Sequence, residues 1–150
     1  KNTQNKNDIC LKILGEISLF PSDIIKDLNK LSEASKENKT LNLIIAINYG
    51  SRQEITSSVK KIAHDIALKK ITINEINEKK ISNYLYTKDL PDPDLIIRTG
   101  GDCRLSNFLL WQSAYSELIF IKKFWPEFSQ GDFLSAIKEF NQRERRFGGL

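Results

Sequence analysis

Short apolar runs alternate with longer amphipathic stretches along the whole chain. The apolar runs predict four strands, at residues 11–15, 41–48, 94–98 and 118–121. The run at 41–48 is almost continuously apolar, which is typical of a strand buried on both faces of a parallel sheet. The first strand follows a polar segment, and we expect residues 1–10 to form a frayed start.

The stretches between the strands have the spacing of helices with one apolar side. Pro21 begins the first helix, which extends to about Lys36. A turn at residues 49–52 leads into a second helix, whose inward face is predicted from apolar positions at helical spacing: Ile55, Val59, Ile62, Ile66 and Ala67. Further helices are predicted at residues 74–84, 106–113 and 131–147.

Strands that alternate with helices favour an α/β fold, with a mostly parallel sheet flanked by helices. In such a sheet, ligands bind beyond the carboxyl ends of the strands. The segments after residues 48, 98 and 121 are therefore the first places to look for a site.

Composition narrows the choice of function. A length of 150 residues suits one domain, and no apolar run approaches the roughly 20 residues that span a bilayer. Two distant cysteines and a single histidine argue against a disulfide framework and a zinc site. The net charge of +4 does not by itself indicate a nucleic-acid partner, since the lysines are scattered and lack interleaved aromatic residues.

The segment 94–108 is the richest in candidate chemistry. Arg98 ends a buried strand, Gly100-Gly101 lets the backbone approach a ligand, and Arg104 adds a second guanidinium suited to phosphate oxygens. Ser106 stands where a helix N-cap is expected, so its hydroxyl and the next N–H groups could face an anion. This combination predicts a diphosphate pocket. The alternative is that Ser106 only caps its helix while the two arginines pair with Asp94 and Asp102.

Four blocks of this sequence resemble the cis-prenyltransferase family, and undecaprenyl diphosphate synthases in particular. The central block is Arg-Thr-Gly-Gly-Asp-x-Arg-Leu-Ser-Asn-Phe-Leu-Leu-Trp-Gln at residues 98–112, followed by Ala-Tyr-x-Glu-Leu at 114–118. The others are Asn-Tyr-Gly-Ser-Arg at 48–52, Trp-Pro-x-Phe at 125–128 and Arg-x-Arg-Arg-Phe-Gly-Gly at 143–149. One departure is Asp102, where the family usually has glutamate.

The resemblance implies a role for each matching residue. The substrate-binding set comprises Arg98, Arg104, Leu105 and Ser106 at the diphosphate of isopentenyl diphosphate, Asn48 and Arg52 in the floor of the site, and Arg146 and Gly148 of the Arg-x-Gly motif. That last motif is expected to reach the partner's diphosphate site in a homodimer. Glu117 would be a ligand of Mg²⁺, a hard cation that takes oxygen ligands.

The resemblance also implies the reaction. An allylic diphosphate, expected to be farnesyl diphosphate, would be extended by isopentenyl diphosphate with cis double bonds, giving a long-chain, undecaprenyl diphosphate-like lipid carrier for the cell wall. We expect a cytoplasmic enzyme that acts at the inner membrane face, because its product associates with membrane. We expect no nucleic-acid partner.

An important block of the family is absent. Met-Asp-Gly-Asn-Gly-Arg-Trp-Ala, which supplies the catalytic aspartate, does not occur in this sequence. Residues 11–150 are therefore interpreted as the C-terminal portion of a single cis-prenyltransferase domain that is inactive alone. The alternative is a non-catalytic cis-prenyltransferase-like subunit, or dimerisation partner, that completes an active one.

Overall fold

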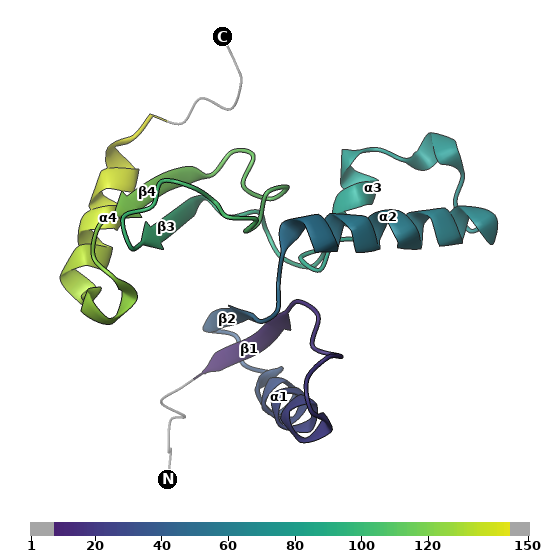
Figure 1. The fold of residues 1–150 in the computed structure, drawn as a ribbon, viewed down its shortest axis with the longest axis horizontal. Coiled ribbons are helices and arrows are strands. Elements are labelled where there is room, and N and C mark those ends of the chain that lie inside the picture. Colours follow the sequence, from purple (N-terminus) through teal and green to yellow (C-terminus); the bar gives the residue numbers. More distant parts are fainter. Residues whose placement is uncertain (1–7, 145–150) are drawn as a thin grey trace. The chain divides into compact units, whose positions relative to one another are not determined.

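The computed structural model describes residues 8–144 and divides the chain into two compact units, one ending at Asp89 and the other beginning at Leu90. Each unit contains a pair of parallel strands with helices beside it (Figure 1). The α/β class and the parallel pairing predicted from the sequence are confirmed.

The first unit is built on strands β1 (Ile9–Leu14) and β2 (Leu41–Ala46), which pair in parallel register. Helix α1 (Ser22–Ser35) connects them, and α2 (Ser51–Ala67) follows β2. A 3₁₀ turn at Ile73–Glu75 and the short helix α3 (Glu78–Ser82) complete the unit, where the sequence predicts one helix over 74–84. The extended backbone of Ile76 and Asn77 separates the two pieces.

Serine hydroxyls connect α1 to β1. Ser35 Oγ accepts a hydrogen bond from the Leu11 N–H at 3.0 Å, and Ser32 Oγ donates to the Leu11 carbonyl at 3.0 Å. These contacts use the backbone groups of β1 that do not face β2. They satisfy polar groups that would otherwise lie partly buried without a partner.

The second unit is built on β3 (Leu95–Thr99) and β4 (Glu117–Ile121), again a parallel pair. A 3₁₀ turn at Trp125–Glu127 leads into α4 (Gln130–Gln142). This helix ends at Gln142 because Arg143 is extended, with φ −81° and ψ 135°, so the helix predicted through residue 147 is too long. No helix within residues 8–144 is long and apolar enough to cross a membrane.

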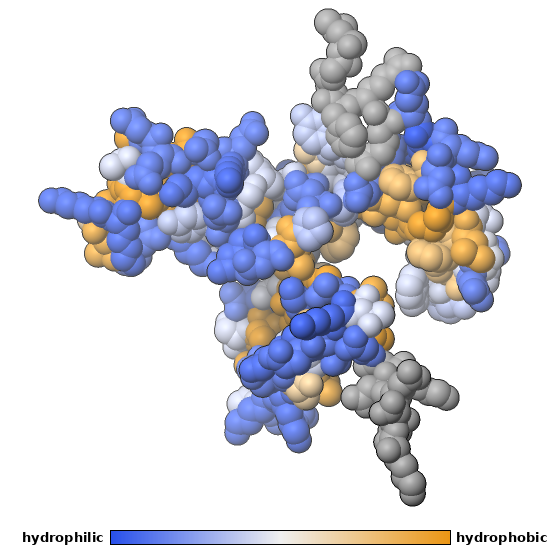
Figure 2. All heavy atoms as spheres, turned by 180° about the vertical axis from the view of Figure 1, so that it is seen from behind, coloured by the Kyte–Doolittle hydropathy of each residue, from blue (hydrophilic) through white to orange (hydrophobic). Residues whose placement is uncertain are grey.

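Burial differs from the prediction in two places. The β2 strand is not buried on both faces: Leu41, Leu43 and Ile45 are all exposed. Helix α2 buries a mostly polar face (Ser51, Glu54, Ser58 and Ile62), while Val59 is exposed. Apolar side chains consequently reach the surface of both units (Figure 2). Periodicity identified the helix and the burial of Ile62 correctly, but not the buried polar residues, because their burial depends on hydrogen bonds to residues 84–86.

Gly15 directly follows β1 with φ +122°, and a Cβ there would lie 2.1 Å from the Ile47 carbonyl oxygen. We expect Gly15→Ala to lower the free energy of unfolding by about 2 kcal/mol or more, because the contact is with backbone that cannot rotate away. Urea unfolding measures the change. Gly131→Ala is the control, since its Cβ would meet only Ser129 Oγ at 3.6 Å and the position is helical. It should be neutral or stabilising by up to about 1 kcal/mol.

Asp132 closes the start of α4. Its carboxylate accepts from Lys123 Nζ at 2.8 Å and from the Ser129 N–H at 2.8 Å, and both contacts lower its pKa, the lysine most. The folded state therefore gains stability above the ordinary aspartate pKa of 3.8 and loses it as the pH falls below that value. We expect the urea midpoints of wild type and Asp132→Asn to differ most near pH 6, and the difference to shrink progressively as the pH falls below 3.8. Asp23→Asn, in the first turn of α1 without a capping hydrogen bond, should show a smaller gap.

Candidate functional site

One cavity in the second unit brings together four of the predicted binding residues. It has a volume of about 340 Å³ and lies where β3 ends. Its lining consists of Ile96, Ile97, Arg98, Thr99, Arg104, Leu105, Ser106 and Phe108. The whole predicted set at the diphosphate of isopentenyl diphosphate thus surrounds a single space.

Arg98 is held in place by its own loop. Its Nη1 donates to Ser106 Oγ at 2.9 Å and also to the Arg104 carbonyl, while Nη2 lies 3.3 Å from Asp102 Oδ2. These contacts occupy three of the five N–H donors that a guanidinium carries. The side chain is about a quarter exposed, so its remaining donors are oriented in advance and still reachable.

Asp102 lies between the two guanidinium groups. Its Oδ2 contacts Arg98 Nη2 and, at 2.5 Å, Arg104 Nη2. The pairing with Asp102 left open by the sequence is therefore present. Two cations and one carboxylate still leave a net positive charge, and the more exposed Arg104 can turn toward an incoming anion.

The helix predicted over residues 106–113 is wrong. The segment consists of turns and bends, and three of its residues, Ser106, Asn107 and Leu109, have positive φ angles between 47° and 65°. Left-handed conformations in non-glycine residues interrupt a helix and persist only where their surroundings impose them. Ser106 accordingly does not cap a helix. Its hydroxyl oxygen accepts from Arg98, and among residues 8–144 its O–H has no acceptor, so it can donate to a ligand in the cavity that it lines.

The Gly100-Gly101 turn positions this loop against the end of β4. Both residues have positive φ, 93° and 80°, a region that favours glycine. The Gly100 N–H donates to the Lys123 carbonyl at 2.7 Å, and the Gly101 N–H donates to the Ile121 carbonyl at 3.0 Å. The glycines therefore serve the turn that returns the chain toward Arg104.

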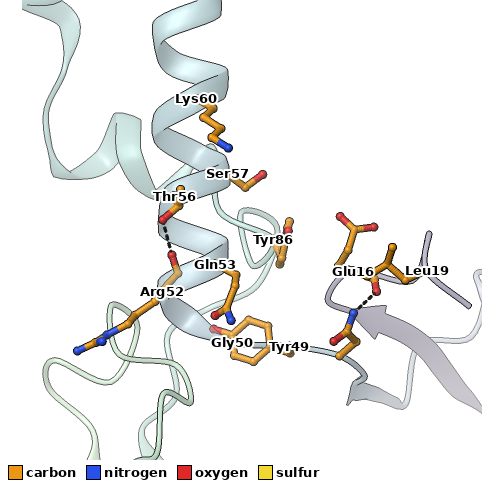
Figure 3. A pocket seen from close by; sticks show the side chains of 11 residues that line it. Glu16, Leu19, Tyr49, Gly50, Arg52, Gln53, Thr56, Ser57, Lys60 and Tyr86 are labelled. Carbon is orange, nitrogen blue, oxygen red and sulfur yellow. Dashed lines mark hydrogen bonds between the residues drawn. The ribbon is translucent and has the colours of Figure 1, made fainter.

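Asn48 and Arg52 line a different cavity, in the first unit. It has a volume of about 630 Å³ and lies between the end of β1, the start of α2 and Tyr86 (Figure 3). Asn48 Nδ2 donates to the Glu16 carbonyl at 2.9 Å, which joins the ends of β1 and β2. The Arg52 side chain extends away from Glu16 and Leu19.

Glu117, the predicted Mg²⁺ ligand, begins β4 beside Arg143. Its Oε2 accepts from Arg143 Nη1 at 2.7 Å, whereas Oε1 accepts no hydrogen bond from residues 8–144. Within this part of the chain, no three metal-binding side chains form a cluster. Mg²⁺ commonly takes only one or two carboxylates and fills its other positions with phosphate oxygens and water. Glu117 Oε1 fits this chemistry because it can supply one carboxylate ligand. The other ligands of the ion would have to come from elsewhere.

The remaining predicted residues, Arg146 and Gly148, lie outside the described residues. Sequence reasoning also missed two polar contacts. Arg143 pairs with Glu117 and Glu139, and the four-residue spacing from Glu139 was a usable signal. Glu54 is fully buried, and no pattern along the chain distinguishes it from a surface glutamate.

Comparison with known proteins gives a consistent result. A family model described as putative undecaprenyl diphosphate synthase matches residues 1–148. An isoprenyl transferase from Thermotoga maritima is 52% identical over 93% of this chain and 59% of its own length. A tritrans,polycis-undecaprenyl-diphosphate synthase (geranylgeranyl-diphosphate specific) from Thermoplasma volcanium is 49% identical over 95% of this chain and 55% of its own length. The chain thus spans little more than half of these relatives.

Solved structures show the same likeness. Lavandulyl diphosphate synthase from Lavandula x intermedia, crystallised with dimethylallyl diphosphate, has a TM-score of 0.93 at 32% identity, covering 97% of this chain and 63% of that one. A probable undecaprenyl diphosphate synthase from Campylobacter jejuni has a TM-score of 0.82 at 35% identity, covering 98% and 66%.

Proposed function

The chain belongs to the undecaprenyl diphosphate synthase family of cis-prenyltransferases, and we propose that the intact protein transfers prenyl groups between diphosphate substrates. The intact protein is the full natural protein that contains these 150 residues. The observation that carries the proposal is the gathering of Arg98, Arg104 and Ser106 around one cavity at the end of a parallel strand.

The first step in the proposal is binding of isopentenyl diphosphate. Arg98 and Arg104 neutralise the diphosphate and donate hydrogen bonds to its oxygens, and the Ser106 hydroxyl donates a further one. Leu105 lies between them in the same loop and lines the same cavity. The fixed Arg98 side chain orients the substrate, so that its double bond can approach the allylic carbon of the second diphosphate.

Charge stabilisation is the main task of such a site. Condensation breaks the bond between the allylic carbon and its diphosphate, forms a carbon–carbon bond to isopentenyl diphosphate and releases a proton. We propose that Glu117 Oε1 is a ligand of Mg²⁺, which when bound would neutralise diphosphate charge. Asn48 and Arg52 are proposed to shape the floor of the site.

The allylic substrate is proposed to be farnesyl diphosphate and the product a long-chain polyprenyl diphosphate, a lipid carrier for the cell wall. The intact protein is proposed to act in the cytoplasm, with a product that partitions into the inner membrane face. Relatives with similar identities are described as geranylgeranyl-diphosphate specific, so both allylic substrates belong in the assay.

We also propose a homodimer in which Arg146 and Gly148 reach the diphosphate site of the partner subunit. Sequence alone supports this part, through the Arg-x-Gly motif. The 150-residue chain is proposed to be inactive by itself, because the block that carries the family's catalytic aspartate is not in its sequence.

The test is incorporation of radiolabelled isopentenyl diphosphate by the intact protein, with Mg²⁺ and either farnesyl or geranylgeranyl diphosphate. We expect extended products, resolved by chain length, and none from the 150-residue chain. Product from the 150-residue chain would refute its inactivity. A folded intact protein that binds isopentenyl diphosphate but makes no product would instead support the non-catalytic subunit, and adding candidate partners would then identify the active one.

A further inference from the structure

Arg143 follows α4, and its side chain contacts Glu117, the first residue of β4. It directly follows the last residue of α4, and its backbone is already extended. Its side chain turns back over the unit and is about one-third exposed. A guanidinium in this position can bridge two carboxylates on different elements.

The bridge that forms joins Glu117 to α4. Nη1 donates to Glu117 Oε2 at 2.7 Å and lies 3.2 Å from the Leu118 carbonyl, while Nη2 donates to Glu139 Oε1 at 2.5 Å. Both carboxylates raise the pKa of Arg143, Glu117 most. Because Glu139 and Arg143 are one helical turn apart, the guanidinium is fixed from α4 before it meets Glu117.

These contacts leave Glu117 with one oxygen occupied and one available. A free glutamate side chain samples many rotamers, and ordering it for a metal costs conformational entropy. With Oε2 fixed by Arg143, Oε1 is oriented in advance. Hydrogen-bonding partners of metal ligands typically contribute 10- to 100-fold to metal affinity in this way.

We propose that Arg143 is a positioning residue that holds the Glu117 carboxylate for a divalent cation. The inference rests on the proposed role of Glu117 in prenyl transfer and adds a residue that contacts neither substrate nor metal. A simple charge effect would act in the opposite direction, since a nearby cation repels Mg²⁺. The sign of the change therefore separates positioning from electrostatics.

The test measures Mn²⁺ binding to the intact protein by loss of the free Mn²⁺ electron paramagnetic resonance signal. Arg143→Ala should bind Mn²⁺ about tenfold more weakly than wild type. Lys138→Ala is the matched control, because it removes the same charge from an exposed position on the same helix. It should bind at least as tightly as wild type. Unchanged or tighter binding by folded Arg143→Ala would overturn the proposal.

A double variant tests whether Arg143 acts through Glu117. Glu117→Gln should weaken Mn²⁺ binding, and adding Arg143→Ala should weaken it no further, whereas an unrelated structural role would add. If wild type binds no Mn²⁺, or Glu117→Gln binds it equally well, the metal role of Glu117 fails and this inference fails with it. If only Arg143→Ala is without effect, this inference alone fails.

Glu139→Gln covers the case in which Arg143→Ala does not fold. Glu139 is about half exposed, so this change should leave the fold intact while loosening the guanidinium from α4. We expect Mn²⁺ binding weaker by up to about fivefold, in line with the strength of exposed ion pairs. Binding equal to wild type would count against positioning by the α4 side of the bridge.

Discussion

Arg98→Ala in the intact protein is expected to bind isopentenyl diphosphate about 100-fold more weakly than wild type. Arg98 is the least exposed cation of its cavity and is already held by Ser106 and Asp102. A hydrogen bond to a charged group contributes about 1.5–3 kcal/mol, and about 1.4 kcal/mol is a tenfold change. Losing two such bonds to diphosphate gives the expected factor. Isothermal titration calorimetry measures it directly.

Three further variants test how much of this loss comes from the shape of Arg98, from Arg104 and from net charge. Arg98→Lys keeps the charge but loses the planar donor set, and should recover only part of the affinity. Arg104→Ala should have a smaller effect than Arg98→Ala, because Arg104 is mostly exposed and its interactions are screened by water. Lys138→Ala, which removes a positive charge from α4, is the control for net charge. Equal losses in this control and Arg98→Ala would refute direct contact.

Replacing Asp102 is expected to change the affinity for isopentenyl diphosphate in the opposite direction. Its carboxylate contacts both Arg98 and Arg104 and offsets part of the positive charge that attracts diphosphate. Asp102→Asn should therefore bind isopentenyl diphosphate more tightly than wild type, provided that thermal unfolding shows an intact fold. Weaker binding by folded Asp102→Asn would mean that Asp102 orients the arginines rather than competing for them.

The candidate cavity also shows what a sequence can predict about a site. The short spacing after one strand predicts Arg98, Arg104 and Ser106 together, and the family resemblance adds Leu105. Their placement around a single space follows from that short connection. The helix after Ser106 was not predictable in the same way. Its residues have acceptable helical spacing, yet the positive φ angles are imposed by tertiary contacts such as the bond from Arg98 to Ser106 Oγ.

Local sequence patterns do not predict contacts between segments that are far apart in the sequence. Strand and helix positions follow from local periodicity, so β1 to β4, α1, α2 and most of α4 agree with the prediction to within about two residues. The exception is the predicted frayed start at residues 1–10, because β1 already begins at Ile9 and Cys10 is buried. Arg143 and Glu117 are 26 residues apart, and no local signal pairs them. The polar inward face of α2 is a similar case, since a buried glutamate there is favourable because of contacts such as the hydrogen bond from the Tyr86 N–H.

Glu54→Ala should be among the most destabilising single substitutions in the first unit. Glu54 is fully buried; its Oε2 accepts from the Tyr49 hydroxyl at 2.7 Å and its Oε1 from the Tyr86 N–H at 2.8 Å. Alanine removes the acceptor of both hydrogen bonds and opens a cavity. A hydrogen bond to a charged group contributes about 1.5–3 kcal/mol, so we expect a loss of about 3 kcal/mol or more in the free energy of unfolding.

Glu54→Gln and Glu33→Ala are the matched controls for this loss. Glutamine keeps an oxygen for the Tyr86 N–H, and the Tyr49 hydroxyl can rotate to accept from the amide, so this variant should lose only about 1 kcal/mol. Glu33 is an exposed glutamate on α1 paired with Lys36, and removing it should cost less than about 0.5 kcal/mol. Urea unfolding followed by circular dichroism gives all three values.

Amide hydrogen exchange tests whether the Glu54 carboxylate holds the Tyr86 N–H. The Tyr86 N–H should exchange faster in Glu54→Ala than the loss of global stability explains, because its acceptor is gone. Tyr49 and Tyr86 both line the larger cavity, beside Asn48 and Arg52. Glu54 therefore joins two residues of that lining, Tyr49 in the turn after β2 and Tyr86. Unchanged protection at Tyr86 in Glu54→Ala would show that the wall is held by other contacts.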